Sequence, residues 1–173
     1  MDFLDLAKAR YSVRKLDDTR PVEEEKLARI IEAGRVAPTA HNFQPVTVWI
    51  IRKKEDLEKV CETTPNTFVR YVSTVLVVGG DPSVAWVREY DDKNFVDVDA
   101  AIVATHMMLE IHDLGLGSTW IGKFDEAKLK EYFPQMKDHN LIAMFPVAYP
   151  AEDAHPSRLH ADVKPTEEFA KEI

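Results

Sequence analysis

The chain is poor in cysteine and has no long apolar runs, and both absences limit what it can be. Cys61 is the single cysteine among 173 residues, which excludes an internal disulfide. The longest apolar runs, such as 46–51 and 74–78, are far shorter than the roughly 20 residues of a membrane-spanning helix. The first ten residues lack the basic start and apolar stretch of a secretory signal. We therefore expect a soluble, cytoplasmic protein with no membrane partner.

Positive charge is also in short supply. Lysine and arginine number 22 against 30 acidic residues, which gives a net charge of −8 and argues against a nucleic-acid partner. None of the six histidines lies four residues from another, the spacing of a helical zinc site, so we expect no metal. Neither a Walker loop nor a Ser-His-Asp or Cys-His order is evident, so hydrolytic chemistry lacks support.

The apolar and charged residues that are present, 45% and 30% of the chain, suit one compact domain. Helices are expected at 2–9, 21–34, 54–62, 97–117 and 125–133, and strands at 46–51, 74–80, 118–122 and 140–150. One long helix beside a small sheet favours an α+β fold over a doubly wound parallel one, although periodicity alone leaves both open. Residues 151–173 read as a polar tail with little core of its own.

The stretch R-Y-S-V-R at 10–14 places two arginines and a serine at alternate positions. In an extended backbone, Arg10, Ser12 and Arg14 would share one face, with the outer Cα atoms about 13 Å apart. The planar guanidinium fork suits phosphate and carbonyl oxygens. The stretch is therefore a candidate anion site, and the alternative is a solvated basic loop that balances nearby acids.

Two further segments carry candidate binding groups. Residues 37–45 hold Thr39, Asn42 and Gln44, whose neutral donors and acceptors suit an amide or imide edge, although such residues are also ordinary in turns. Gly122 ends the predicted strand 118–122, where a glycine lets a flat ligand approach the backbone closely. The alternative is that the glycines of this region serve only to end the preceding helix.

Four segments in the same order resemble the nitroreductase family of FMN-dependent oxidoreductases, in its short-chain form. They are R-Y-S-V-R (10–14), A-P-T-A-H-N-F-Q-P (37–45), residues 97–122, and A-Y-P-A-E-D-A-H-P-S-R (148–158). The resemblance implies an α+β fold in which a small mixed or antiparallel sheet and its helices surround a long central helix. It also implies an intertwined homodimer with FMN at the interface. Residues 1–150 would form the FMN-binding domain, and 151–173 would wrap the partner subunit.

The resemblance also assigns roles to residues. Arg10, Ser12 and Arg158 match phosphate-binding positions, Arg14 matches a cation near flavin N1, and Gly122 matches a backbone N–H directed at N5. The cofactor-binding set comprises Arg10, Tyr11, Ser12, Arg14, Pro38, Thr39, Asn42, Gln44, Trp120, Ile121, Gly122, Lys123 and Arg158. Within it, the loop residues Thr39, Asn42 and Gln44 would come from the partner subunit, and Lys123 would lie near flavin O4.

Some positions depart from the family pattern. Thr39 stands where serine is usual, which keeps the hydroxyl. Pro156 stands where a basic residue is common, which leaves open whether His160 assists Arg158 at the phosphate. Asn66 is a poor match for a contact to the pyrimidine edge.

The implied activity passes hydride from NADH or NADPH through flavin N5 to a nitroaromatic, quinone or similar small molecule, by a ping-pong mechanism. No protein side chain would act as acid or base, because the flavin carries the chemistry. Trp86, Tyr90 and Phe95 could form the wall of the acceptor site or could be ordinary surface. The alternatives are an FMN-binding protein for storage, delivery or sensing without turnover, a specialised flavin chemistry, and a small α+β domain without a cofactor.

Overall fold

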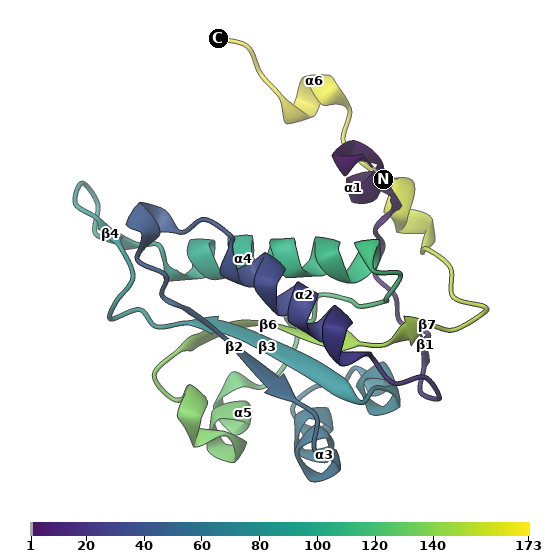
Figure 1. The fold of residues 1–173 in the computed structure, drawn as a ribbon. Coiled ribbons are helices and arrows are strands. Elements are labelled where there is room, and N and C mark those ends of the chain that lie inside the picture. Colours follow the sequence, from purple (N-terminus) through teal and green to yellow (C-terminus); the bar gives the residue numbers. More distant parts are fainter. Residues whose placement is uncertain (1) are drawn as a thin grey trace.

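A computed structural model describes residues 2–173 (Figure 1). Its helices are α1 (Phe3–Ala9), α2 (Glu24–Arg35), α3 (Lys54–Glu62), α4 (Val96–Asp113), α5 (Glu126–Tyr132) and α6 (Thr166–Phe169). Its strands are β1 (Leu16–Asp17), β2 (Val46–Ile51), β3 (Thr74–Gly80), β4 (Val87–Arg88), β5 (Lys93–Asn94), β6 (Asn140–Val147) and β7 (Tyr149–Pro150). Short 3₁₀ turns lie between several of these elements.

The main sheet has three strands in the order β2-β3-β6, and both neighbouring pairs are antiparallel. β3 lies in the middle and is buried along its whole length. Two smaller antiparallel pairs, β1 with β7 and β4 with β5, complete the strands. The expected α+β fold is confirmed, and the doubly wound parallel alternative is wrong because every strand pair is antiparallel.

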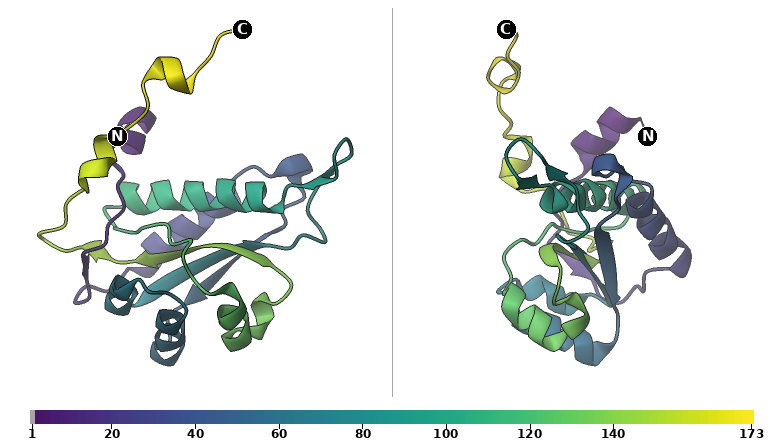
Figure 2. Two further views of the ribbon diagram at one scale, coloured as in Figure 1. Left: turned by 180° about the vertical axis from the view of Figure 1, so that it is seen from behind. Right: turned by 90° about the vertical axis from the view of Figure 1, so that its left-hand side faces the viewer.

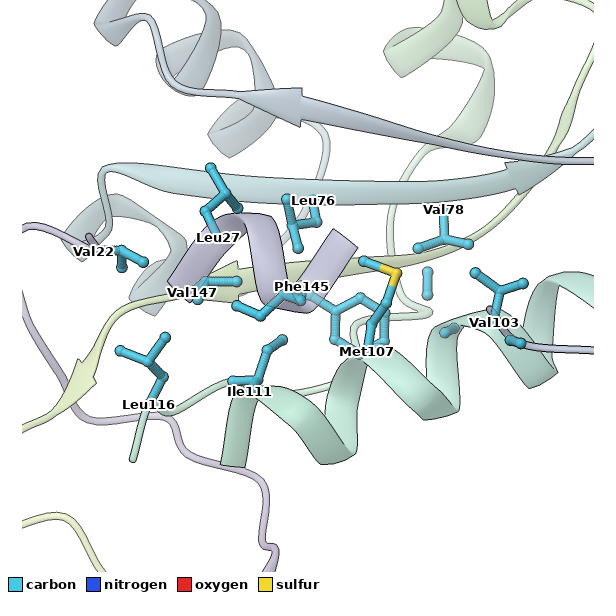
Figure 3. Packing of buried hydrophobic residues seen from close by; sticks show 14 of the residues in the cluster. Val22, Leu27, Leu76, Val78, Val103, Met107, Ile111, Leu116, Phe145 and Val147 are labelled. Atoms are coloured by element: carbon cyan, nitrogen blue, oxygen red, sulfur yellow. The ribbon is translucent and has the colours of Figure 1, made fainter. Parts of the chain in front are cut away.

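Helices cover both faces of the sheet. α2 and α4 lie on one face, and α3 and α5 lie on the other (Figures 1 and 2). β3 supplies both cores, because successive side chains of a strand point to opposite faces. Leu76 and Val78 face α2 and α4, where Met107 and Phe145 complete the core shown in Figure 3. Val75 and Val77 belong to the core on the other face.

The central helix α4 follows from an apolar stripe with helical spacing. Ala100, Val103, Ala104, Met107 and Ile111 are all buried on one side of it. The predicted range, 97–117, is too long at its C-terminal end. Gly115 takes a φ of +72°, and the next N–H, that of Leu116, bonds back to the Ile111 carbonyl, which ends the helix at Asp113.

The predicted strand 118–122 is wrong as a continuous strand. The segment contains one isolated bridge, Ile121 with Met144 of β6, and a second, Gly117 with Ala148, directly precedes it. Between them, the Ser118 carbonyl accepts the N–H of Val13 instead, so no regular ladder forms. The predicted strand 140–150 also divides, because Tyr149–Pro150 leaves the main sheet to pair with β1.

The two ends of the chain lie apart from the core. Neither α1 nor α6 contains a buried residue, and both extend away from the sheet (Figures 1 and 2). Phe3 is 71% exposed and Phe169 is 83% exposed. No residue of 151–173 is buried, as expected for a tail without its own core.

Candidate functional site

The stretch 10–14 is fixed to the fold by its apolar residues. Val13 is 2% exposed, and its N–H donates to the Ser118 carbonyl at 2.9 Å. Its side chain packs so closely on Gly117 that a Cβ there would lie 2.9 Å from Val13 Cγ1. Tyr11 packs on the same core. Because Tyr11 and Val13 face inward, the alternate residues Arg10, Ser12 and Arg14 are left on the outer side.

A small cavity separates this stretch from the C-terminal segment. It has a volume of about 190 Å³ and is lined by Tyr11, Ser12, Arg14, Lys15, Ala154, His155 and Ser157. The predicted residues Ser12 and Arg14 therefore share one hollow with an imidazole and a second hydroxyl. Arg10 and Arg158 do not line it, and Arg158 is exposed at the start of the 3₁₀ turn Arg158–Ala161.

His160, in the same turn, lies beside the Arg10 stretch. Its Nε2 is 3.0 Å from the Lys8 carbonyl oxygen, and its ring lies 6.2 Å from that of Tyr11 at an angle of 66°. The His112 ring also lies near Tyr11, 6.5 Å away at 74°. Two imidazoles therefore lie beside Tyr11, and the charge of Arg10 acts on one of them, His112.

Charged groups lie close enough to His112 to affect its pKa. Burial lowers the pKa of His112, and the charge of Arg10 lowers it further. His160 acts in the same direction, while Asp113 opposes them. An anion bound here would meet cationic and hydrogen-bonding groups. Sequence reasoning did not single out His112, because a histidine near a helix end is common and carries no specific signal.

The segment 120–123 presents an open backbone. Gly122 is exposed, and a Cβ placed on it would meet nothing closer than Trp120 Nε1 at 3.9 Å. Trp120 packs edge-on against Phe145, with the ring centroids 5.4 Å apart. Ile121 is buried in the core, so only its backbone could contact a ligand.

Asn66, which is absent from the predicted set, is connected to this segment by hydrogen bonds through Thr64. Its Nδ2 donates to Thr64 Oγ1 at 2.9 Å, and that hydroxyl donates to the carbonyl of Lys123 at 2.7 Å. The Thr64 hydroxyl therefore links the Asn66 side chain to the backbone of Lys123, which is exposed. Sequence reasoning could not place it firmly, because the contact joins segments far apart in the chain.

The loop 37–45 has a strained backbone. His41, Asn42 and Gln44 have φ values of 51°, 58° and 52°, a region that non-glycine residues seldom occupy. Each such residue costs on the order of 1–3 kcal/mol and persists only where its surroundings hold it, and such residues cluster at ligand sites. Here the Gln44 N–H donates to Thr39 Oγ1 at 3.0 Å, and its Nε2 donates to Asn42 Oδ1 at 3.1 Å. Pro38, before them, is exposed.

An aromatic stack joins this loop to the β4–β5 hairpin. The His41 ring stacks on Trp86 with centroids 4.9 Å apart, and Trp86 meets Phe95 edge-on at 4.8 Å. Tyr90 lies between the two strands and is 88% exposed. Two of the three residues expected to form an acceptor wall, Trp86 and Phe95, thus pack beside the loop, and Tyr90 does not join their stack.

The two groups of predicted residues lie at opposite ends of α4. His112 and Tyr11 mark the C-terminal end, and Asp99, which contacts Ala40 of the loop, marks the N-terminal end. With a rise of 1.5 Å per residue, these ends are about 20 Å apart. In Figures 1 and 2, the segment after α1 and the loop before β2 lie at opposite ends of this helix. Within one chain, Thr39, Asn42 and Gln44 therefore do not approach Arg10–Arg14.

Residues 2–173 contain no group of three or more histidine, cysteine, aspartate or glutamate side chains that could hold a metal ion. None of the helices described over this range has the length and apolar character needed to cross a membrane.

The sequence pattern of the nitroreductase family matches residues 7–149, most of the chain. The chain belongs to this family. A nitroreductase family protein of Clostridium difficile 630, solved as a crystal structure, is 33% identical, with a TM-score of 0.90 over 99% of this chain and 98% of that one. A relative in Methanothermobacter thermautotrophicus is 29% identical over 94% of this chain and 87% of its own length. Its provisional name is NADH dehydrogenase/NAD(P)H nitroreductase.

One further structure shows the fold with a ligand. A provisionally named nitroreductase from Exiguobacterium sibiricum was solved in complex with FMN. It is 20% identical and has a TM-score of 0.86 over the whole of this chain and 98% of that one. At this identity, the likeness to the E. sibiricum structure shows the fold alone.

Proposed function

We propose that this member of the nitroreductase family is an FMN-dependent oxidoreductase that uses NADH or NADPH to reduce a small molecule such as a nitroaromatic or a quinone. The observation that carries the proposal is the pairing of the basic stretch 10–14 with the open backbone at Gly122, held together through Val13 and Ser118. The FMN complex of the E. sibiricum protein and the NAD(P)H in the name of the M. thermautotrophicus relative support it.

The donor set suits the chemistry of FMN. A phosphate needs cations and hydroxyls, which Arg10 and Ser12 supply on the outer side of their stretch. An isoalloxazine ring needs an unobstructed backbone, and no atom lies within 3.9 Å of a Cβ built on Gly122. Arg10 and Arg14, about 13 Å apart in extended backbone, would serve the two ends of the cofactor.

In this proposal, Arg14 lies near flavin N1, where a cation favours negative charge on the ring. The Gly122 N–H is directed at N5, and Lys123 lies near O4. At the phosphate end, Arg158 is joined by His160, because His160 lies against Lys8 and Tyr11. When bound, FMN would supply the redox chemistry, in which one half-reaction takes hydride from NAD(P)H and the other passes it to the acceptor.

We further propose that two chains complete each site. Thr39, Asn42 and Gln44 of one protomer would meet the flavin held by Arg10–Arg14 of the other. This arrangement is supported by the distance of about 20 Å between the two ends of α4. A partner would also cover the apolar side chains exposed on α1 and on 151–173, which we expect to wrap it.

FMN titration followed by an NADH or NADPH oxidation assay tests the proposal. We expect saturable FMN binding, and steady oxidation of one nicotinamide cofactor only when a quinone or nitroaromatic acceptor is present. Failure to bind FMN would contradict the whole proposal. Tight binding without turnover by any acceptor would favour a storage, delivery or sensing role instead.

A further inference from the structure

Asp99 is a buried acid with an unusual environment. It lies in the first turn of α4 and is 1% exposed. Its Oδ1 accepts the N–H of Ala40 at 2.8 Å, whereas its Oδ2 has no hydrogen-bond partner among residues 2–173. Aspartate is seldom fully buried without a paired cation, and none of the ion pairs described over this range includes Asp99. A buried carboxyl oxygen without a hydrogen-bond partner costs free energy, so the acid calls for a role that offsets this cost.

Its one bond goes to the start of the strained loop. Ala40 directly precedes His41 and Asn42, which both have positive φ. Inside the loop, the Asn42 N–H donates to the Thr39 carbonyl at 2.9 Å, and the Phe43 N–H donates to the Ala40 carbonyl at 3.1 Å. These bonds shape the turn but do not fix it to the protein. The bond from Ala40 to Asp99 fixes it to the central helix.

We propose that Asp99 is a positioning residue that holds the loop 39–44 in its binding conformation. By fixing the Ala40 N–H, it sets where the left-handed residues begin and so aims Asn42 and Gln44. Asp99 itself touches no ligand. The inference rests on the proposed function only in the assignment of this loop to FMN.

The consequence for binding is tested by FMN titration of three variants. Asp99→Ala removes the acceptor and should raise the FMN dissociation constant about tenfold. Asp99→Asn keeps an oxygen that can accept the Ala40 N–H and should stay within about threefold of wild type. Asp97→Ala is the matched control, because Asp97 is an exposed acid of the same helical turn that does not bond the loop. Unchanged FMN affinity in Asp99→Ala would overturn the inference.

A change on the loop side keeps the inference testable if Asp99→Ala does not fold. Ala40 opens a 3₁₀ turn, and Thr39 has φ −128° and ψ 158°, which suits a residue before proline. Ala40→Pro therefore suits the preceding backbone, and it replaces the N–H that Asp99 accepts with a ring carbon, which breaks this bond and displaces the carboxylate. It should weaken FMN binding as much as Asp99→Ala. Wild-type affinity in Ala40→Pro would contradict the inference.

Amide hydrogen exchange without FMN separates this inference from the proposed function. In Asp99→Ala and Ala40→Pro, the amides of 42–44 should exchange faster than in wild type, while those of β3 stay protected. Faster exchange of both regions in either variant would mean a general stability role and would overturn the inference, as would unchanged exchange of the loop. If wild type binds no FMN, the proposed function fails, and the exchange data still decide the role of Asp99.

Discussion

The two ends of α4 carry the candidate binding groups in different ways. At the C-terminal end, the stretch 10–14 is held by packing, with Val13 pressed against Gly117. At the N-terminal end, the loop 39–44 is held by hydrogen bonds and an aromatic stack in a strained backbone. The first end therefore needs a close fit, and the second needs a few individual polar contacts.

The two ends of α4 also differ in charge, and each carries the sign that the helix dipole favours there. Arg10 and His112 lie at the C-terminal end, where the dipole favours cations. Asp97 and Asp99 lie in the first turn, where it favours anions. The comparison indicates that one end is suited to an anionic group and the other to the polar edge of a neutral one. FMN has both, an anionic phosphate and the polar edge of a neutral ring.

The largest expected effect comes from mixing two defective variants. If each site takes one end of α4 from each protomer, Arg10→Ala and Asn42→Ala homodimers would each have two impaired sites. A mixed dimer would have one site with both defects and one with neither, because the two sites are related by a two-fold axis. We expect FMN affinity near that of wild type to return on subunit exchange, as measured by titration of the mixture.

Two controls define this experiment. Mixing Arg10→Ala with Ser12→Ala, both on the same end of α4, should restore nothing. Recovery in that control, or none in the first mixture despite proven subunit exchange, would mean that both ends serve a site within one chain.

Arg10→Ala alone tests the anionic end. Loss of a charge-assisted bond to phosphate should weaken FMN binding by roughly 1.5–3 kcal/mol, about 10- to 100-fold in the dissociation constant. Arg52→Ala is the control, because Arg52 is an exposed arginine that pairs with Glu24 and lies outside the predicted binding set. The phosphate role would be refuted by equal FMN affinities of Arg10→Ala and wild type.

Local patterns predicted much of the fold. The stripe of α4 and the apolar run of β3 need only helical and strand periodicity, and both lie where the sequence puts them. The alternation in 10–14 likewise predicted that Arg10, Ser12 and Arg14 would share one face, and the residues between them, Tyr11 and Val13, pack on the core. The antiparallel arrangement could not be predicted in this way, because periodicity does not report how strands pair.

The parts that failed depend on contacts between distant segments. The segment 118–122 shares its backbone bonds between Val13 and β6, and no local pattern reveals that division. The contact of Asp99 with Ala40 likewise joins residues 59 positions apart. The positive φ of Gln44 was also not predictable, because glutamine is not a residue type that favours it. The roles of the predicted residues toward FMN stay predictions, since they concern a ligand and a second chain.

Two glycine substitutions test separately the close packing of Val13 on Gly117 and the open approach to the backbone at Gly122. Gly117→Ala places a methyl group 2.9 Å from Val13 Cγ1 and should destabilise the fold by about 1–3 kcal/mol. Gly122→Ala meets no close atom and should leave the melting temperature unchanged while weakening FMN binding. Thermal unfolding and FMN titration of both variants measure this. A large loss of stability in Gly122→Ala would contradict an open approach.

Arg14→Ala should make bound FMN harder to reduce. Loss of a cation near N1 should lower the potential by tens of millivolts, since 30 mV in a two-electron couple corresponds to about 1.4 kcal/mol. Arg14→Lys keeps the charge and should retain most of the wild-type potential. A potential in Arg14→Ala equal to or above that of wild type would place Arg14 elsewhere.

The smallest expected effect is a pH dependence from His112. Its pKa in the fold is lowered, chiefly by burial and then by Arg10, so the native state binds this proton less readily than the unfolded chain. Stability without FMN should therefore fall as the pH drops below about 6.5. His112→Asn, which does not titrate, should lose less stability over the same range in thermal unfolding. Saturating FMN should reduce the difference, because a phosphate beside Arg10 would offset the positive charge that disfavours the imidazolium. An unchanged difference with FMN bound would argue that the phosphate lies away from this end of α4.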